Sequence, residues 1–264
     1  MEAFERVQAA RAKGRPTGTD FINHIFEDFI EMHGDRRFGD DKAIVAGIAR
    51  LNGLPVTVIA LERGHDTKEK LFRNFGSAHP EGYRKALRQM KLAEKFHRPV
   101  VCFVDTAGAF CGIAAEERGQ AQAIAENLYE MMTLKTPILS IFIGEGGSGG
   151  ALGLAVADEV WMLENAVYSV ISPEGCASIL WKDSSKVREA AACLRMTAQD
   201  LLEFGIIEKV IPEEQNQFEE VYQSLKAELY EKLSHNATLP IQQLLDNRYN
   251  RFRRLGAGNG LLHW

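Results

Sequence analysis

The chain has 264 residues, of which 45% are hydrophobic and 25% charged, and its formal net charge at pH 7 is -5. This composition is typical of a globular protein with a sizeable core, and the mild acidity argues against nucleic acid as a partner, because nucleic-acid-binding proteins usually carry a basic face. The sequence holds no run of about 18 apolar residues and its first residues lack the apolar core of a signal peptide, so we expect no membrane association and a cytoplasmic location.

The four cysteines lie far apart, which argues against a metal site. They are Cys102, Cys111, Cys176 and Cys193, and no two of them form a Cys-x-x-Cys pair. Structural zinc sites usually draw on such pairs, so we expect this chain to bind no metal. Cys102 and Cys176 stand in apolar or helical surroundings, and we interpret them as reduced core thiols.

The first part of the chain predicts a polar segment, a helix and a hairpin. Residues 1–20 are polar and include a breaker-rich stretch, so we interpret them as an N-terminal segment outside the main domain. Residues 21–33 carry apolar side chains at a helical period after Asp20, which suits an N-cap. Residues 43–51 and 55–61 predict two strands, and Asn52-Gly53 between them favours a tight hairpin turn.

One structural unit then occurs twice after a helix predicted over residues 83–96. An apolar strand at 99–105 leads into a turn of small residues and a long helix at 116–134. The same order of strand, glycine turn and helix starts again at residue 137. Farther along, we expect strands at 160–163, 167–171 and 206–211, helices that begin after Ser172 and Thr197, and an amphipathic helix over 213–233.

This alternation of strands and helices predicts α/β architecture. We place the main domain at residues 21–235 and treat residues 236–264 as a polar C-terminal tail. The tail carries an arginine cluster, which we interpret as part of a disordered or docking segment. Its members are Arg248, Arg251, Arg253 and Arg254.

The most informative stretch is Gly144-Glu-Gly-Gly-Ser-Gly-Gly150, which has five glycines in seven residues and follows an apolar strand. Its spacing fits the Gly-x-Gly-x-x-Gly dinucleotide fingerprint, with Glu164 twenty residues on, but it falls in mid-chain and before a very short strand. It also fits the Gly-x-Ser-x-Gly nucleophile elbow, yet the histidines that follow, His235 and His263, both lie in the polar tail. No Gly-Lys-Ser/Thr follows, so a P-loop is excluded.

A third interpretation needs no nucleophilic side chain. Two glycine turns that end buried strands can direct backbone N–H groups at one developing oxyanion, and the loss of such a donor costs roughly 3–4 kcal/mol. The alternative is that the glycines only allow a helix to pack closely on a strand. Four glycines beside a second turn at Gly108 favour the oxyanion site.

Several long motifs resemble one known family. They are the glycine stretch itself, Tyr168-Ser-Val-Ile-Ser-Pro-Glu-Gly175 with its continuation to Lys182, Glu116-Glu-Arg-Gly-Gln120 and His79-Pro-Glu-Gly-Tyr-Arg-Lys85. Over roughly residues 7–212 the chain resembles the carboxyltransferase alpha subunit of bacterial multi-subunit acetyl-CoA carboxylase. The resemblance implies a crotonase-like (ClpP-type) fold, a spiral of strand-strand-helix units with peripheral helices.

The resemblance also implies a reaction and its site. Such enzymes move the carboxyl group of carboxybiotin to acetyl-CoA and form malonyl-CoA, the first committed step of fatty acid synthesis. Loss of the carboxyl group leaves an oxyanion on the biotin ureido group. We expect backbone donors for it at Gly149, Gly150 and Ala151, and contacts with carboxybiotin at Gly146, Gly147, Gly108 and Ala109.

The partners implied are a beta subunit that carries the zinc, in an arrangement of two alpha and two beta chains, a biotin carboxyl carrier protein that delivers carboxybiotin, and biotin carboxylase in the wider complex. The first turn reads Asp105-Thr-Ala-Gly-Ala-Phe-Cys-Gly112 where the family usually has Asp-Thr-Pro-Gly-Ala-Tyr-Pro-Gly, so the roles of Ala107, Phe110 and Cys111 stay open. Two other functions compete: a stand-alone crotonase-like acyl-CoA hydratase or decarboxylase, and a regulatory subunit that only binds a partner.

Overall fold

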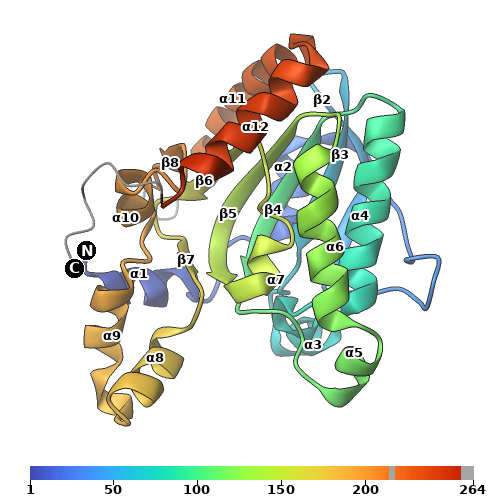
Figure 1. Cartoon of the computed structure of the whole chain (residues 1–264). Coiled ribbons are helices and arrows are strands. Elements are labelled where there is room, and N and C mark those ends of the chain that lie inside the picture. Colours follow the sequence, from blue (N-terminus) through green and yellow to red (C-terminus); the bar gives the residue numbers. More distant parts are fainter. Residues whose placement is uncertain (214–217, 257–264) are drawn as a thin grey trace.

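An eight-stranded mixed sheet organises the chain, which a computed structural model describes over residues 1–213 and 218–256 (Figure 1). The order is β1-β2-β3-β4-β5-β6-β8, and β7 pairs with β5 off this path. The first three strands pair antiparallel and the others parallel, so the predicted α/β architecture is confirmed. The strands are β1 (Glu27–Glu31), β2 (Ile44–Leu51), β3 (Leu54–Leu61), β4 (Val100–Thr106), β5 (Ile138–Gly147), β6 (Glu159–Leu163), β7 (Val167–Ser169) and β8 (Lys209–Ile211).

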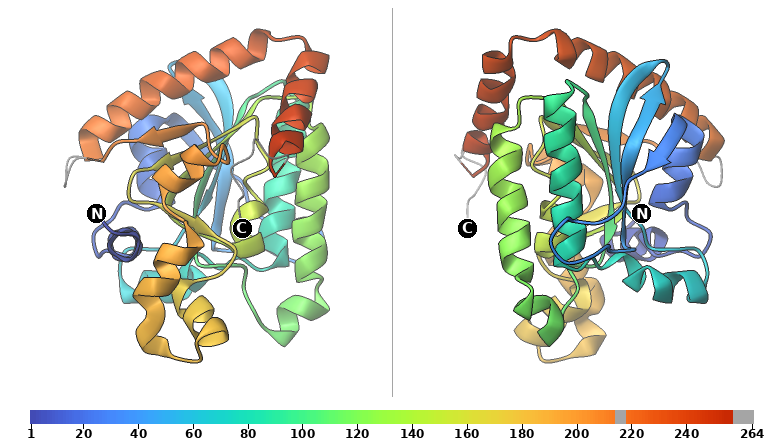
Figure 2. Two further views of the ribbon diagram at one scale, coloured as in Figure 1. Left: turned by 60° about the vertical axis from the view of Figure 1, so that its left-hand side comes forward. Right: turned by 90° about the vertical axis from the view of Figure 1, so that its right-hand side faces the viewer.

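Helices cover both faces of this sheet, as the right-hand view in Figure 2 shows. On one face lie α4 (Pro80–Lys95) and α6 (Gln120–Thr133), and on the other lie α2 (Gly18–Ile25) and α11 (Phe218–Thr238). A lobe beside the sheet contains α1 (Ala3–Ala10), α8 (Pro173–Leu180), η2 (Ser184–Lys186) and α9 (Val187–Leu194), at the lower left of Figure 1. The remaining elements are α3 (Thr67–Phe72), η1 (Asn74–Gly76), α5 (Ile113–Glu117), α7 (Ser148–Leu152), α10 (Ala198–Glu203) and α12 (Ile241–Arg254).

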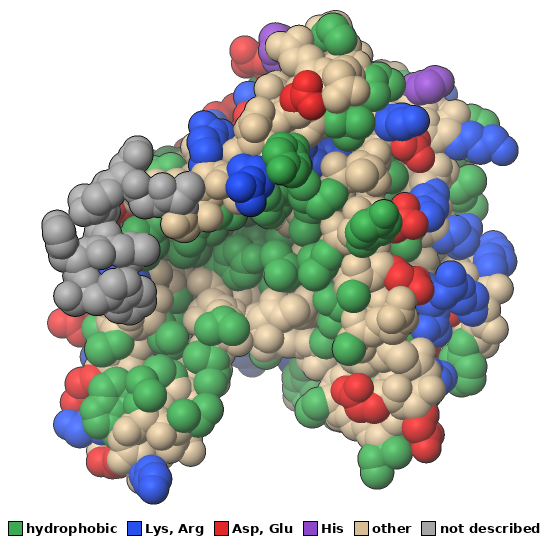
Figure 3. All heavy atoms as spheres, in the orientation of Figure 1, with side chains coloured by type: hydrophobic (Ala, Val, Ile, Leu, Met, Phe, Trp, Pro, Cys, Tyr) green, Lys and Arg blue, Asp and Glu red, His purple; other side chains and the backbone are tan. Residues whose placement is uncertain are grey.

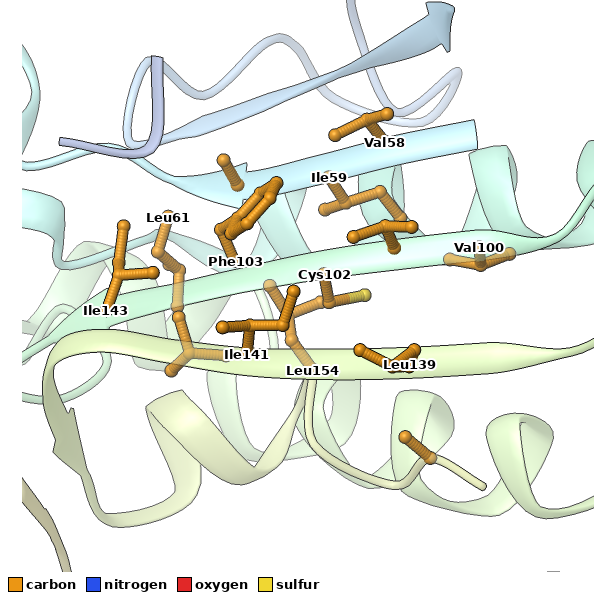
Figure 4. Close-up of a cluster of buried hydrophobic side chains, with 14 of the residues drawn as sticks. Val58, Ile59, Leu61, Val100, Cys102, Phe103, Leu139, Ile141, Ile143 and Leu154 are labelled. Carbon is orange, nitrogen blue, oxygen red and sulfur yellow. The ribbon is translucent and has the colours of Figure 1, made fainter. Parts of the chain in front are cut away.

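The core lies along the central strands β3, β4 and β5. Every residue of β4 is buried, because a parallel strand with helices on both sides has no solvent-facing side. Figure 4 shows Phe103, Ile59 and Ile141 packed together from the three strands. Complete burial of one such side chain stabilises the fold by about 1.5–3 kcal/mol. Within the described ranges, no helix has both the length and the hydropathy that a membrane span requires.

The predicted hairpin turn and the two predicted helix starts, after Ser172 and after Thr197, are confirmed. Asn52 and Gly53 both have positive φ, at 48° and 83°, which is the backbone of a type I′ turn between β2 and β3. The hydroxyl of Ser172 accepts the N–H of Gly175 at the start of α8. Thr197 caps α10 in the same way.

The helix predicted over residues 21–33 is wrong in its second half. The helix α2 ends at Ile25, and the chain continues as the edge strand β1. A positive φ of 54° at Asp28 and antiparallel pairing with β2 interrupt the helical period. Phe26 is still buried in the core and Phe29 packs against the core, whereas Ile30 is exposed.

Residues 1–20 and 236–256, which the sequence predicts as polar segments outside the main domain, contain helices that contact the rest of the fold. In α1, Val7 and Ala10 are buried against Val167 and Met196. In the predicted tail, α11 runs past residue 235 and α12 carries a fully buried Arg248, so a disordered segment is wrong for the arginine cluster, and a docking role stays a prediction. The domain boundaries at residues 20 and 235 stay predictions, and residues 257–264 of the predicted tail lie outside the described residues.

Candidate functional site

The two glycine-containing turns meet at one edge of the sheet. They follow β4 and β5, which are neighbouring parallel strands, so both turns lie at the carboxyl ends of the strands. A methyl group built on Gly147 would lie 2.0 Å from the carbonyl oxygen of Ala107. One built on Gly150 would lie 2.4 Å from the nitrogen of Ala109 and 2.6 Å from the carbonyl carbon of Gly108. The backbones of the two turns are therefore in direct contact, which requires glycine at both positions.

Four of the seven residues of the glycine stretch belong to a strand, where the sequence predicts a turn from residue 144. Residues 144–147 continue β5, and residues 145–147 pair with β7. Here the glycines allow close packing: a methyl group on Gly144 would lie 2.4 Å from Oδ1 of Asp105, and one on Gly146 would lie 2.2 Å from the ring of Phe142. The contact of Gly146 with carboxybiotin stays a prediction, and this glycine faces a buried ring.

The chain reverses at Ser148 and enters α7. Ser148 has a φ of +52°, which is uncommon for a residue with a side chain. Gly147 is the N-cap, so the N–H groups of Gly149 and Gly150 have no partner inside the helix. The roles of the N–H groups of Gly149, Gly150 and Ala151 as oxyanion donors stay predictions.

An open, largely apolar cleft of about 320 Å³ lies beside this turn. Figure 3 shows it as a hollow between the lobe and the helices that cover the sheet. Gly149 faces open space, since a methyl group there would meet nothing nearer than Ile124 at 3.8 Å. The lining residues are Ser148, Gly149, Leu152, Tyr168, Ser169, Val170, Leu201 and Ile206.

A side chain of α6 holds the first turn, residues 105–112, in place. The side-chain amide of Gln120 donates to the carbonyl of Phe110 at 3.0 Å and to that of Ala78 at 2.7 Å. The ring of Phe110 stacks on His79 with centroids 4.0 Å apart, so it is fixed without a tyrosine hydroxyl. Cys111 is exposed and free.

A network of charged side chains lies beneath the glycine turn. The carboxylate of Glu145 pairs with Arg63 at 2.5 Å and with Arg11 of the N-terminal segment at 2.8 Å. Arg11 also reaches Glu174 of α8 at 2.6 Å. Asp105 accepts the N–H of Glu145 at 2.9 Å. Complete burial raises the pKa of Asp105 above its usual range, although the Arg63 guanidinium opposes this shift.

Sequence patterns missed this network, because its members are far apart in the chain. Arg11 and Glu145 are separated by 134 positions. In the sequence, only Glu145 points to this network, as a single acidic residue among five glycines. No local pattern identifies its partners. The network fixes the end of β5 and links the turn to the lobe that borders the cleft.

We expect Glu145→Gln to lower the free energy of unfolding by about 2 kcal/mol, because it removes the charged hydrogen-bond partner of the buried Arg63 guanidinium. Arg63 is well buried, and Glu145 is its closest carboxylate. Urea denaturation measures the change. Glu174→Gln is the matched control, since that side chain is half exposed and should change stability by less than about 0.5 kcal/mol. Equal stability of the two variants would contradict a structural role for Glu145.

Comparison with known families and relatives adds a second line of evidence. The family described as acetyl co-enzyme A carboxylase carboxyltransferase-like matches residues 1–256. A protein from Ruminiclostridium cellulolyticum, named acetyl-coenzyme A carboxylase carboxyl transferase subunit alpha, is 64% identical over 256 residues, which cover 97% of this chain and 98% of that protein. A Clostridium acetobutylicum protein of the same name is 57% identical and covers 97% of this chain and 95% of its own length.

Solved structures share the architecture at low sequence identity. A transcarboxylase 12S structure with methylmalonyl-coenzyme A and methylmalonic acid bound has a TM-score of 0.69 at 19% identity, and the match covers 86% of this chain and 42% of that one. A Pseudomonas malonate decarboxylase hetero-tetramer in complex with coenzyme A has a TM-score of 0.65 at 18% identity, with 83% of this chain and 92% of that one covered. These likenesses concern the fold, and the predicted crotonase-like α/β fold is confirmed.

Proposed function

This chain belongs to the acetyl-CoA carboxylase carboxyltransferase-like family, and on that basis we propose that it is the alpha subunit that moves the carboxyl group of carboxybiotin to acetyl-CoA. The product is malonyl-CoA, the committed intermediate of fatty acid synthesis. The observation that carries the proposal is the 64% identity, over 97% of the chain, to a relative named as this subunit. The same identity disfavours a stand-alone hydratase or decarboxylase.

The glycine turn supports a defined role in this reaction. Departure of the carboxyl group leaves negative charge on the ureido oxygen of biotin, and preorganised N–H groups stabilise such a charge. Gly149, which lines the cleft, and the buried Gly150 beside it would supply the donors, with Ala151 as a third candidate. We place Gly147, Gly108 and Ala109 in the adjoining wall, because their backbones pack against the turn at Gly150. The biotin oxyanion itself can take the acetyl proton, so the turn needs no basic side chain.

The cleft beside the turn supports binding of the biotin ring. Ligand pockets are usually apolar with a few polar groups that fix orientation, and this cleft joins aliphatic side chains to the free N–H groups of one turn. The carrier protein would present carboxybiotin from the open side. Acetyl-CoA would enter from the beta subunit.

The subunit name of the relatives supports a partner chain. We propose a beta subunit that carries the zinc, in a complex of two alpha and two beta chains, with biotin carboxyl carrier protein and biotin carboxylase in the wider assembly. Large apolar side chains at the rim of the lobe suit such an interface, since Val170 is 76% and Ile179 67% exposed. The cytoplasmic location stays a prediction.

The proposal is tested by co-purification with the beta subunit of the same organism. The complex should decarboxylate malonyl-CoA in the presence of free biotin, and this chain alone should be inactive. If the isolated chain turns over an acyl-CoA, the stand-alone enzyme becomes the better assignment. If substitutions in the glycine turn leave the activity of the complex intact, the chain acts only as a regulatory subunit.

A further inference from the structure

The short helix α7 cannot hold its own position. It has five residues, and helices of this length are unstable without outside contacts. The N–H of Leu154 donates to Ala151 at 3.1 Å, so it does not serve the carbonyl of Gly150 four residues back. The carbonyls of Gly150, Gly153 and Leu154 therefore need donors from elsewhere in the fold.

Three buried side chains from three different elements supply these donors. The hydroxyl of Tyr83 in α4 donates to Gly150 at 3.1 Å, the amide of Asn127 in α6 to Gly153 at 3.0 Å, and the hydroxyl of Ser140 in β5 to Leu154 at 2.6 Å. All three side chains are fully buried. Each of these hydrogen bonds stabilises the fold, because a buried carbonyl without a donor costs about 1–3 kcal/mol.

We propose that Tyr83 is a positioning residue for the glycine turn: its hydroxyl holds the carbonyl of Gly150, which shares a peptide plane with the N–H of Ala151, and so fixes the direction of the backbone donors at the start of α7. The inference rests on the proposed function. Gly150 is held from two sides, by Tyr83 at its carbonyl and by the backbone of Gly108 and Ala109 at its Cα. The ring of Tyr83 also lies against Gly153, where an added methyl group would be 3.0 Å away.

The chemistry of the phenol suits this role. Burial raises the pKa of Tyr83 far above its ordinary value, so the hydroxyl remains a donor throughout the working pH range. Preorganised donors act in catalysis only while their direction is fixed, and an oxyanion donor displaced by a fraction of an ångström loses much of its effect. Tyr83→Phe removes this one hydrogen bond and keeps the ring.

The test uses the complex with the beta subunit and the assay of malonyl-CoA decarboxylation. We expect Tyr83→Phe to lower kcat by about tenfold while KM for malonyl-CoA and for biotin changes by less than about twofold. Asn127→Leu removes the donor to Gly153 and should lower kcat in the same way. Tyr222→Phe is the matched control, since Tyr222 is also a buried tyrosine but packs from α11 on Phe21 of α2, on the far face of the sheet.

A kcat for Tyr83→Phe within about twofold of the wild type overturns the inference, and so does an equal loss in Tyr222→Phe. A second readout is hydrogen exchange of the amides at residues 148–155, which should be faster in Tyr83→Phe than in the control. An inactive wild-type complex would refute the proposed function instead. The exchange rates would then decide whether Tyr83 holds the turn, and equal rates in the two variants would show that it does not.

Discussion

Replacing Gly150 by alanine should lower kcat of the assembled enzyme by a factor of about 100 or more. The new methyl group would lie 2.4 Å from the nitrogen of Ala109 and 2.6 Å from the carbonyl carbon of Gly108. Both are backbone atoms, so no side chain can rotate away, and the two turns must separate. In the proposed mechanism, the N–H of Gly150 would move with them and no longer meet the developing oxyanion. Malonyl-CoA decarboxylation with free biotin measures the loss, and gel filtration confirms that the complex still assembles.

The matched control is Gly149→Ala. Gly150→Ala disturbs the packing of the two turns, whereas Gly149→Ala adds a methyl group only where a ligand would approach. Its methyl group would meet only Ile124, at the ordinary contact distance of 3.8 Å, so stability should change by less than about 0.5 kcal/mol. The methyl group nevertheless stands at the wall of the cleft, where it would obstruct carboxybiotin. We expect reduced activity in a fully stable protein. Full activity of Gly149→Ala would mean that the substrate does not approach this residue, and full activity of both variants would refute the oxyanion assignment.

The sequence predicts the position of the turn because its signals are local. A buried strand, a run of glycines and a small-residue helix follow one another, and a second unit of the same order precedes them. Neighbouring parallel strands bring the two turns to one edge without further information. The extent of the turn is less predictable, because Gly144 and Gly146 are glycines of a strand, selected by the side chains of Asp105 and Phe142 that pack on them.

Contacts between distant segments explain the remaining differences. Residues 21–33 have a helical apolar period, yet pairing with β2 converts the second half into an edge strand. Burial of α1 depends on Val167 and Met196, which lie more than 150 positions away. The support of α7 by Tyr83 and Asn127 is equally invisible in the sequence, because neither residue belongs to a pattern that points at the turn.

The arginine cluster of the last helix shows the same effect most clearly. Arg248 is fully buried and forms a bidentate pair with Asp158, at 2.8 and 3.0 Å. Its guanidinium also donates to three backbone carbonyls that lie at the end of α6 and just before β5, those of Met131, Leu134 and Thr136. All five N–H groups of the side chain therefore donate a hydrogen bond, and these bonds hold α12 against the end of α6 and the residues just before β5 and β6.

Arg248→Ala should therefore lower the free energy of unfolding by about 3–5 kcal/mol, because it leaves the carboxylate of Asp158 and three carbonyls without their partner. Arg248→Lys should recover only part of this loss, since an ammonium group cannot form the bidentate pair. Arg253→Ala is the matched control: it removes an exposed arginine from the same helix and should change stability by less than about 0.5 kcal/mol. Urea denaturation measures all three variants. Similar losses for Arg248→Ala and Arg253→Ala would mean that the cluster acts through its total charge, as a docking segment would, and not through the buried contacts of one residue.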